Sequence, residues 1–278
     1  MASVKVNGAE LYYQESGSGP ETIVFSHGLL MDHTMFEAQR AAFESRYRVI
    51  AYDHRGQGNS SDPGTGYDMD TIAEDAAALI QALNAAPCHF AGLSMGGFAG
   101  MRLASRHPQL IRTLTLMNTG SGKEGTLDRV RYGFLAQLVK LVGTAPFVGI
   151  AVKELFGRST RRSKDPAKQG MLKSWTEKLR HRPKHTAHSI LAVMNRREFT
   201  AQELAAIKCP TLIITGEDDT AQVPANSEHL ASSIQGSKLV RIPASGHSSS
   251  LEQPEAVTAA MRDFIESATA TQGRSAGH

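Results

Sequence analysis

The sequence predicts an α/β protein with a mostly parallel central sheet, helices on both faces and an inserted helical cap. Two observations indicate this fold. Short apolar runs bounded by turn residues alternate with helical patterns, which is typical of a parallel sheet covered on both faces. The alternation breaks over residues 121–205, where every signal is helical, and it resumes afterwards to about residue 267.

The apolar runs give the expected strands in chain order. The first two, Val4–Val6 and Leu11–Gln14, flank Asn7-Gly8, a pair that strongly favours a two-residue hairpin turn. The later expected strands are Thr22–Phe25, Tyr47–Tyr52, Cys88–Ala91, Leu110–Met117, Thr211–Thr215 and Lys238–Ile242.

Helical signals separate most of these strands. Thr71 with Glu74 predicts a capping box at the start of the first clear helix. Apolar residues then recur on one face of that helix, at Ile72, Ala76, Leu79, Ile80 and Leu83.

The expected cap has helix signals of its own. Pro166 follows Asp165 at a helix start, and Thr200 with Glu203 predicts another capping box. One helix face would carry Val130, Phe134, Leu138 and Leu141.

These signals divide the chain into regions. Residues 1–120 and 206–267 form the expected core, and residues 121–205 form the cap. Residues 268–278 have little to bury, so we expect a disordered tail.

Charge is distributed unevenly along the chain. The net charge of +3 is too small to indicate a nucleic-acid binder. Residues 121–200, however, hold 17 Lys and Arg against 6 Asp and Glu, a balance of +11, which leaves −8 for the remainder. These cations either form solvated helix faces or attract an anionic substrate or surface.

The sequence also indicates where the protein is located and whether it binds a metal. No apolar run approaches the roughly 20 residues needed to cross a bilayer, and the N-terminus does not resemble a secretory signal, so we expect no stable membrane insertion. Cys88 and Cys209 give neither a disulfide framework nor enough ligands for zinc. We therefore predict a cytoplasmic protein without a metal.

Ser94 is the strongest candidate nucleophile. It lies in Gly92-Leu-Ser94-Met-Gly96, between a strand-like run and a helical stretch. This setting is that of a nucleophile elbow, in which glycines two residues before and after the serine avoid collisions. The alternative is a glycine-rich helix start with a serine cap.

A serine hydroxyl needs a base to remove its proton, and that base needs an acid to orient it. His247 follows a strand-like run in a loop, where catalytic side chains are often mounted. Asp219 follows another strand and is our choice for the acid, with Asp218 and Glu217 as alternatives.

The tetrahedral intermediate needs N–H donors for its oxyanion. We expect one from Met95, directly after the nucleophile, and another from Leu29, which the turn at Gly28 would point inward. His27 is expected to anchor this loop rather than to act as a base.

Together these motifs resemble the α/β-hydrolase superfamily over about residues 4–267. The matching pieces are His27-Gly28, Asp53-His-Arg55-Gly56-Gln-Gly58, Gly92-Leu-Ser94-Met-Gly96, Gly216-Glu-Asp-Asp219 with Pro224, and Gly246-His247 with Glu252-Gln-Pro254. The resemblance implies a triad of Ser94, His247 and Asp219, oxyanion donors at Leu29 and Met95, structural roles for Asp53 and Arg55, and a helical lid over the pocket.

The resemblance also implies the reaction class. Epoxide hydrolases and haloalkane dehalogenases of this fold place an aspartate at the elbow, so Ser94 argues against both. We therefore predict a serine esterase, without a cofactor, that cleaves a small carboxylic ester or lactone. A 3-oxoadipate enol-lactonase-like activity, a cofactor-free haloperoxidase or perhydrolase activity and a ligand receptor on a hydrolase scaffold are alternatives.

Two further interactions stay open in the sequence. The basic cap predicts either solvated surface or association with an anionic membrane surface, and the oligomeric state cannot be read. Candidate substrate contacts in the cap are Phe134, Leu138, Phe147, Trp175 and Met194, each of which could instead pack between helices.

Overall fold

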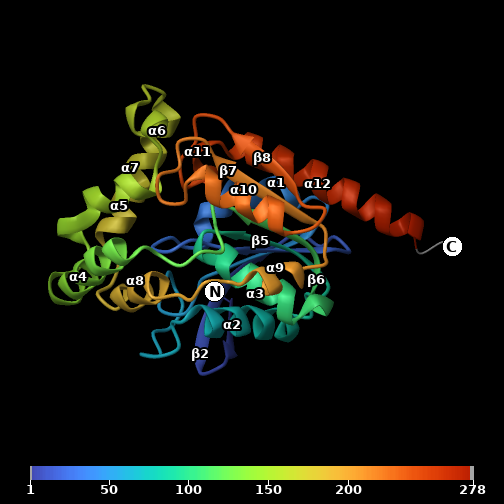
Figure 1. The fold of residues 1–278 in the computed structure, drawn as a ribbon, viewed down its shortest axis with the longest axis horizontal. Coiled ribbons are helices and arrows are strands. Elements are labelled where there is room, and N and C mark those ends of the chain that lie inside the picture. The colour runs from blue at the N-terminus through green and yellow to red at the C-terminus, as the bar shows by residue number, and fades with distance from the viewer. Residues whose placement is uncertain (1, 276–278) are drawn as a thin grey trace.

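A computed structural model of the chain describes residues 2–275 (Figure 1). Its strands are β1 (Ala2–Val6), β2 (Ala9–Ser16), β3 (Thr22–Ser26), β4 (Arg48–Tyr52), β5 (Cys88–Leu93), β6 (Ile111–Met117), β7 (Thr211–Gly216) and β8 (Lys238–Ile242). Its α-helices are α1 (Glu37–Phe43), α2 (Met69–Ala82), α3 (Met95–Arg106), α4 (Thr126–Val142), α5 (Val148–Leu155), α6 (Arg158–Arg162), α7 (Pro166–Arg180), α8 (Thr186–Met194), α9 (Ala201–Ala205), α10 (Pro224–Ser233), α11 (Ser249–Glu252) and α12 (Pro254–Ser275). Short 3-10 turns cover His33–Phe36, Pro108–Leu110 and Ala145–Phe147.

The strands form one sheet in the order β1-β2-β4-β3-β5-β6-β7-β8. The pairs β1–β2 and β2–β4 are antiparallel, and every other neighbouring pair is parallel. The predicted hairpin joins β1 to β2, where Asn7 and Gly8 both have positive φ, as its turn requires.

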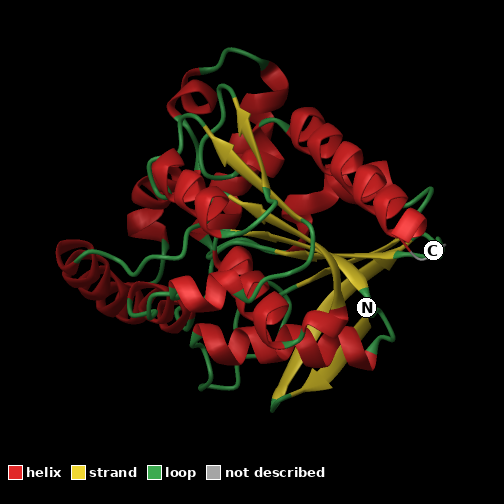
Figure 2. Ribbon diagram, turned by 45° about the vertical axis from the view of Figure 1, so that its right-hand side comes forward, coloured by secondary structure: helices red, strands yellow, loops and turns green. Residues whose placement is uncertain are grey.

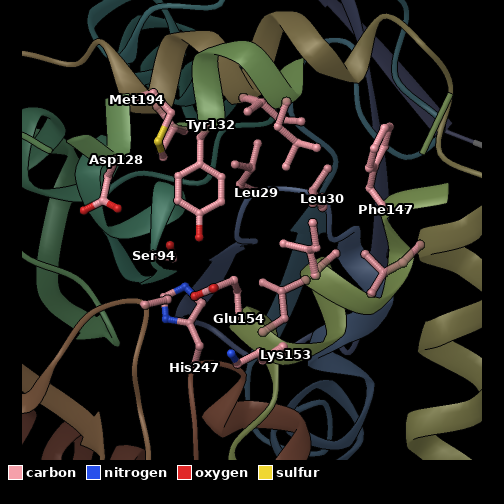
Figure 3. A pocket seen from close by; sticks show the side chains of 18 of the residues that line it. Leu29, Leu30, Ser94, Asp128, Tyr132, Phe147, Lys153, Glu154, Met194 and His247 are labelled. Carbon is pink, nitrogen blue, oxygen red and sulfur yellow. The ribbon is translucent and has the colours of Figure 1, made fainter. Parts of the chain in front are cut away.

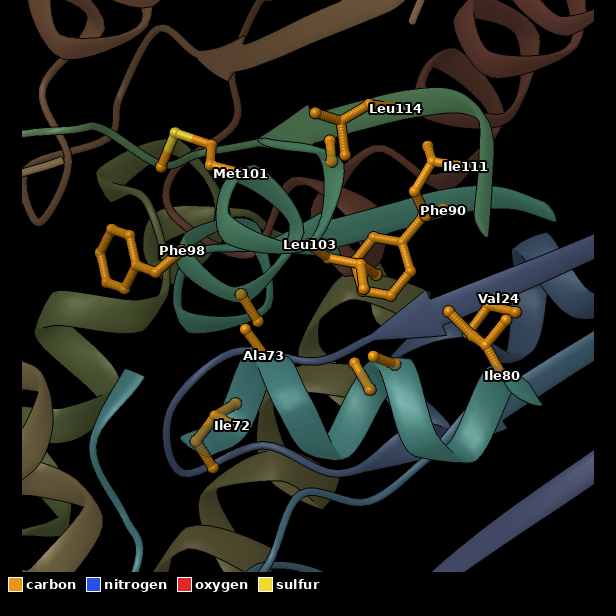
Figure 4. Close-up of a cluster of buried hydrophobic side chains, with 14 of the residues drawn as sticks. Val24, Ile72, Ala73, Ile80, Phe90, Phe98, Met101, Leu103, Ile111 and Leu114 are labelled. Atoms are coloured by element: carbon orange, nitrogen blue, oxygen red, sulfur yellow. The ribbon is translucent and has the colours of Figure 1, made fainter. Parts of the chain in front are cut away.

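Helices cover both faces of the sheet (Figure 2). Side chains of β3 alternate between the two resulting cores: Val24 packs in the core beneath α2 and α3, whereas Ile23 and Phe25 pack in the core beneath α1 and α12. Figure 4 shows the first of these cores, where Val24 and Phe90 lie near Ile80 of α2 and Leu103 of α3. The predicted α/β-hydrolase fold is therefore confirmed.

Helices α4 to α8 are inserted between β6 and β7 and gather on one side of the molecule (Figure 1). Two expected helix starts in and after this segment are confirmed: Asp165 caps α7 at Pro166, and Thr200 forms a capping box with Glu203 at α9. The short helix α9 departs from the expected cap, because its Leu204 packs in the main core.

Two other expectations differ from the structure. Helix α2 begins at Met69 and is capped by Asp68, whose side chain accepts a hydrogen bond from the Thr71 N–H, so Thr71 is not the cap. Helix α12 continues through residues 268–275, which we expected to be disordered. Ala268 is still buried there, and alanine and glutamine favour helix in the following turn. Residues 276–278 lie outside the described residues.

None of the helices within residues 2–275 is both long and apolar enough to span a membrane.

Candidate active site

Ser94 lies at a sharp bend between β5 and α3, as predicted. Its backbone has φ of 52° and ψ of −111°, in a left-handed region that a serine rarely adopts. The bend is held by hydrogen bonds from the Ser94 N–H to the Met117 carbonyl at 2.9 Å and from the Thr119 hydroxyl to the Ser94 carbonyl at 2.9 Å. The fold therefore holds the serine in a strained conformation at the end of a central strand.

Glycines make this bend possible. A Cβ on Gly92 would lie 2.2 Å from the Gly96 carbonyl oxygen, and one on Gly96 would lie 2.1 Å from the Ser26 carbonyl oxygen. Because these neighbours are backbone atoms of packed elements, no side chain fits at either position.

His247 lies in the loop between β8 and α11, and its ring is buried. Its Nδ1 is 3.0 Å from Asp219 Oδ2 and 3.2 Å from Oδ1. Burial disfavours the charged imidazolium, but attraction and hydrogen bonding to Asp219 outweigh burial and raise the pKa of His247 above 6.5. The carboxylate thus orients the ring and favours its protonated form.

The structure brings Asp219, rather than Asp218, to the imidazole. Asp219 Oδ1 also accepts hydrogen bonds from the N–H groups of Ala221 and Gln222, both at 2.9 Å. Asp218 instead faces the helical insertion, where its Oδ2 accepts a hydrogen bond from the Ser159 N–H at 3.0 Å.

Asn118 is a residue of this site that the sequence analysis missed. Its side-chain amide donates to Asp219 Oδ2 at 2.9 Å and to the Gly246 carbonyl at 3.0 Å. It therefore links Asp219 to the loop that carries His247. The available signal was its place directly after β6, at the same sheet edge as the other site residues, in a left-handed turn with φ of 48°.

Ser94 and His247 line one cavity of about 500 Å³. Figure 3 shows the Ser94 hydroxyl above the imidazole, with the Tyr132 hydroxyl directed toward both from the other side of the cavity. An alcohol, an imidazole and a carboxylate that are far apart in the chain therefore converge at one place.

The expected oxyanion donors flank this place. Met95 is the first residue of α3, where a helix leaves its N–H groups unbonded, and Leu29 lines the cavity wall. Within residues 2–275, neither of these two N–H groups has a hydrogen-bond acceptor. Both are thus available to a bound oxygen.

Buried side chains hold the Leu29 loop in place. His27 Nδ1 donates to the Gly28 carbonyl at 2.7 Å, and its Nε2 accepts from the His54 N–H at 3.0 Å. Burial lowers the pKa of His27, so the ring is a neutral anchor with both nitrogens occupied. The neighbouring Leu30 N–H donates to Gln57 Oε1 at 2.9 Å.

Asp53 and Arg55 also make structural contacts. Asp53 accepts hydrogen bonds from the backbone N–H of His33 at 2.7 Å and of Asn59 at 2.8 Å. Arg55 forms a buried two-pronged ion pair with Asp75, at 2.5 and 2.6 Å.

Glu252 joins the helical insertion to the His247 loop. Its buried carboxylate accepts hydrogen bonds from the N–H groups of Gly157 at 2.8 Å, Gly246 at 3.0 Å and Ser248 at 3.2 Å. The sequence analysis noted Glu252 within a motif but assigned it no role.

The cavity wall is mainly apolar. Of the five predicted substrate contacts, the structure brings Phe147 and Met194 to the cavity but not Phe134, Leu138 or Trp175. Phe134 is 67% exposed on the outer face of α4, whereas Trp175 is buried among α5 and α7 side chains. Leu138 is half-buried on α4 outside the cavity. Helical spacing alone does not determine which face of a helix in the insertion meets the core.

Tyr132 and Glu154, two polar side chains of the insertion, face Ser94 in the cavity. Burial and the negative charge of Glu154 raise the pKa of Tyr132 to about 12, so the phenol stays protonated at neutral pH. Both side chains line the cavity with Ser94 (Figure 3). Among the described residues, no cluster of three or more His, Cys, Asp or Glu side chains is arranged to hold a metal ion.

Comparison with known proteins identifies the fold family. The family model of the alpha/beta hydrolase fold matches residues 21–254. The chain belongs to the α/β-hydrolase family. This family and the relatives described next show that the chain is a hydrolase.

Relatives of this α/β-hydrolase have several named activities. The chain is 31% identical to 3-oxoadipate enol-lactonase 1 of Acinetobacter baylyi, over 95% of this chain and 93% of the relative. It is 30% identical to a non-heme haloperoxidase of Rhodococcus erythropolis, over 94% and 97%. A thermophilic esterase from Thermogutta terrifontis has a similar structure, with a TM-score of 0.88 and 27% identity over 96% of this chain and 99% of that one.

Proposed function

We propose that this α/β-hydrolase is a serine esterase that cleaves a small carboxylic ester or lactone through an acyl-enzyme. Ser94 Oγ attacks the carbonyl carbon while its proton passes to Nε2 of His247. The carbonyl oxygen becomes an oxyanion between the N–H groups of Leu29 and Met95. The C–O bond then breaks, and the leaving alkoxide takes the proton from His247.

Water completes the cycle. It attacks the acyl carbon and gives a proton to His247, and the second tetrahedral intermediate collapses to the carboxylic acid while Ser94 recovers its proton. Asp219 holds the imidazole in the tautomer that accepts at Nε2 and stabilises the imidazolium.

The single observation that carries this proposal is the hydrogen bond of 3.0 Å between His247 Nδ1 and Asp219, in a ring that lines the same cavity as the strained Ser94. The unbonded N–H groups of Leu29 and Met95 support their role as hydrogen-bond donors to the oxyanion.

The cavity supports an uncharged acyl group as the substrate. Leu29, Leu30, Phe98 and Val193 give the cavity that holds Ser94 an apolar wall. Its three carboxylates, Glu124, Asp128 and Glu154, are matched in number by three cations, Arg131, Lys153 and Arg161, so the lining favours neither sign of charge. A volume of about 500 Å³ suits a small ester. Helices α4, α5 and α8 supply much of the wall, so we propose that the insertion acts as a cap.

Hydrolysis of p-nitrophenyl acetate tests the proposal. We expect Ser94→Ala to reduce turnover by at least a thousandfold without changing the melting temperature. Ser232→Ala, on the exposed surface of α10, is the control and should keep both the parental turnover and the parental melting temperature. Turnover by Ser94→Ala at the wild-type rate would remove Ser94 from the mechanism. A panel of neutral and anionic esters and lactones would then separate the esterase from an enol-lactonase-like activity.

We also propose a cytoplasmic location. The free thiols of Cys88 and Cys209 support a reducing compartment.

A further inference from the structure

Helix α4 of the insertion carries a stripe of large apolar side chains that face solvent. Leu127 is 81% exposed, Val130 66%, Phe134 67% and Leu141 69%. Their spacing of three, four and seven residues puts them on one helix face. We call these four residues the α4 stripe.

The α4 stripe is not the face by which the helix packs on the protein. That role belongs to Ala136 and Val139, which are buried against Ala187 and Ile190 of α8. A surface helix normally presents polar side chains to water, so a continuous apolar stripe on the outer face marks an interaction site.

Cations flank the α4 stripe. Arg129, Arg131 and Lys140 are exposed on α4 itself. Lys184 Nζ donates to the Leu141 carbonyl at 2.6 Å, so a fourth cation lies at the end of the stripe. Asp128 is the acidic residue of α4, and residues 121–200 as a whole carry a balance of +11.

We propose that the α4 stripe and its flanking cations dock the protein on an anionic membrane surface. Apolar side chains would enter the boundary between headgroups and acyl chains, and the cations would meet the lipid phosphates, as in other interfacial helices. A second copy of the chain fits the stripe less well, because two such faces would bring like charges together.

The docked face lies beside the cavity opening. Arg131 flanks the stripe and also lines the cavity, together with exposed Ile150 and Lys153. A bilayer on this face would therefore supply apolar esters next to Ser94. This last consequence rests on the proposed esterase activity, whereas the docking itself does not.

Vesicle sedimentation tests the docking. We expect the full chain to bind vesicles of phosphatidylglycerol mixed with phosphatidylcholine and to bind pure phosphatidylcholine at least tenfold more weakly. Binding should weaken as the ionic strength rises to about 1 M, where the Debye length is about 3 Å. Equal binding to both vesicles, or none to either, would overturn the proposal.

Variants test whether the α4 stripe is responsible for vesicle binding. Leu127→Ser with Leu141→Ser should reduce vesicle binding at least tenfold while keeping the melting temperature and p-nitrophenyl acetate hydrolysis. Val223→Ser, which removes an exposed apolar side chain beside α10, is the matched control and should bind as the parent does. If the double variant still bound vesicles, the α4 stripe would not be the docking surface. If the parent formed a dimer in ultracentrifugation and only the double variant were monomeric, the stripe would be an interface between two copies of the chain instead.

The two proposals fail independently. Ser94→Ala should bind vesicles as the parent does, because docking needs no chemistry. An inactive parent that still binds anionic vesicles would refute the esterase alone, and an active parent that ignores them would refute the docking alone.

Discussion

The Glu252 carboxylate accepts a hydrogen bond from the Gly157 N–H at 2.8 Å, across 95 residues of chain. The same carboxylate accepts from Gly246, the residue before His247. Gly157 and Gly246 approach so closely that a Cβ on Gly246 would lie 2.2 Å from the Gly157 nitrogen. One buried acid therefore sets the position of the helical insertion and of the histidine loop together.

We expect Glu252→Gln to disturb both segments. A glutamine keeps the size of the side chain, but its NH2 group cannot accept from the N–H groups that Glu252 now satisfies. Leaving buried donors unpaired should cost about 1–3 kcal/mol of the free energy of unfolding. Thermal unfolding measures this loss, and kcat/KM for p-nitrophenyl acetate should fall about tenfold as His247 loses its support.

The pH profile distinguishes positioning from mere destabilisation. Glu252 helps to raise the pKa of His247, so Glu252→Gln should move the acid limb of kcat/KM to lower pH. Glu255→Gln, exposed in the first turn of α12, is the matched control and should change neither stability nor the profile. A stable Glu252→Gln enzyme with the parental profile would show that the carboxylate has no positioning role.

The pH dependence of activity should reflect the His247–Asp219 pair. The imidazole must be neutral to accept the Ser94 proton, and Asp219 raises its pKa, so kcat/KM should fall as the pH drops through a value above 6.5. Asp219→Asn removes the attraction but keeps the burial, which should move this acid limb to lower pH and slow turnover roughly ten-thousandfold.

Asp218→Asn is the control for this experiment. The Asp218 carboxylate faces Ser159 rather than the imidazole, so the acid limb of kcat/KM and the turnover rate should both stay close to those of the parent. If Asp218→Asn lost activity and Asp219→Asn kept it, the partner of His247 would be Asp218.

Much of the site was predictable because its residues follow strands. Ser94, Asp219 and His247 each come shortly after a run of apolar residues, and the carboxyl ends of parallel strands meet at one edge of the sheet. Asn118 follows a strand in the same way, but an asparagine has no chemistry of its own that would single it out.

The packing of the helices in the insertion was harder to predict. Phe134 and Leu141 recur at helical spacing and were expected on one face, which is correct, yet that face meets water. Spacing defines a stripe on a helix, but only the tertiary packing of α4 on α8 decides whether the stripe or its opposite face is buried. For the same reason the sequence could not separate Trp175, in the core, from Phe147, on the cavity wall.

The elbow glycines should tolerate no side chain. In Gly96→Ala the new Cβ would meet the Ser26 carbonyl of the central strand β3, so we expect a loss of more than about 3 kcal/mol in the free energy of unfolding, or no folded protein. Soluble yield and thermal melting measure this loss.

Gly133→Ala on α4 supplies the matched comparison. Nothing lies within 4 Å of the added Cβ, so the better helix propensity of alanine should raise stability by about 0.5–1 kcal/mol. A Gly96→Ala protein that melts and turns over like the parent would contradict the steric argument for the bend.

The cavity wall should control the preferred acyl length. Met194→Ala opens space in the cavity that holds Ser94, so kcat/KM for p-nitrophenyl hexanoate relative to the acetate should rise about tenfold, and Met194→Trp should lower the same ratio. Trp175→Ala is the contrasting change: it should cost about 3–5 kcal/mol of stability, because the side chain is buried, and leave the ratio unchanged. If Trp175→Ala altered the ratio and Met194→Ala did not, the acyl group would bind against α7 rather than α8.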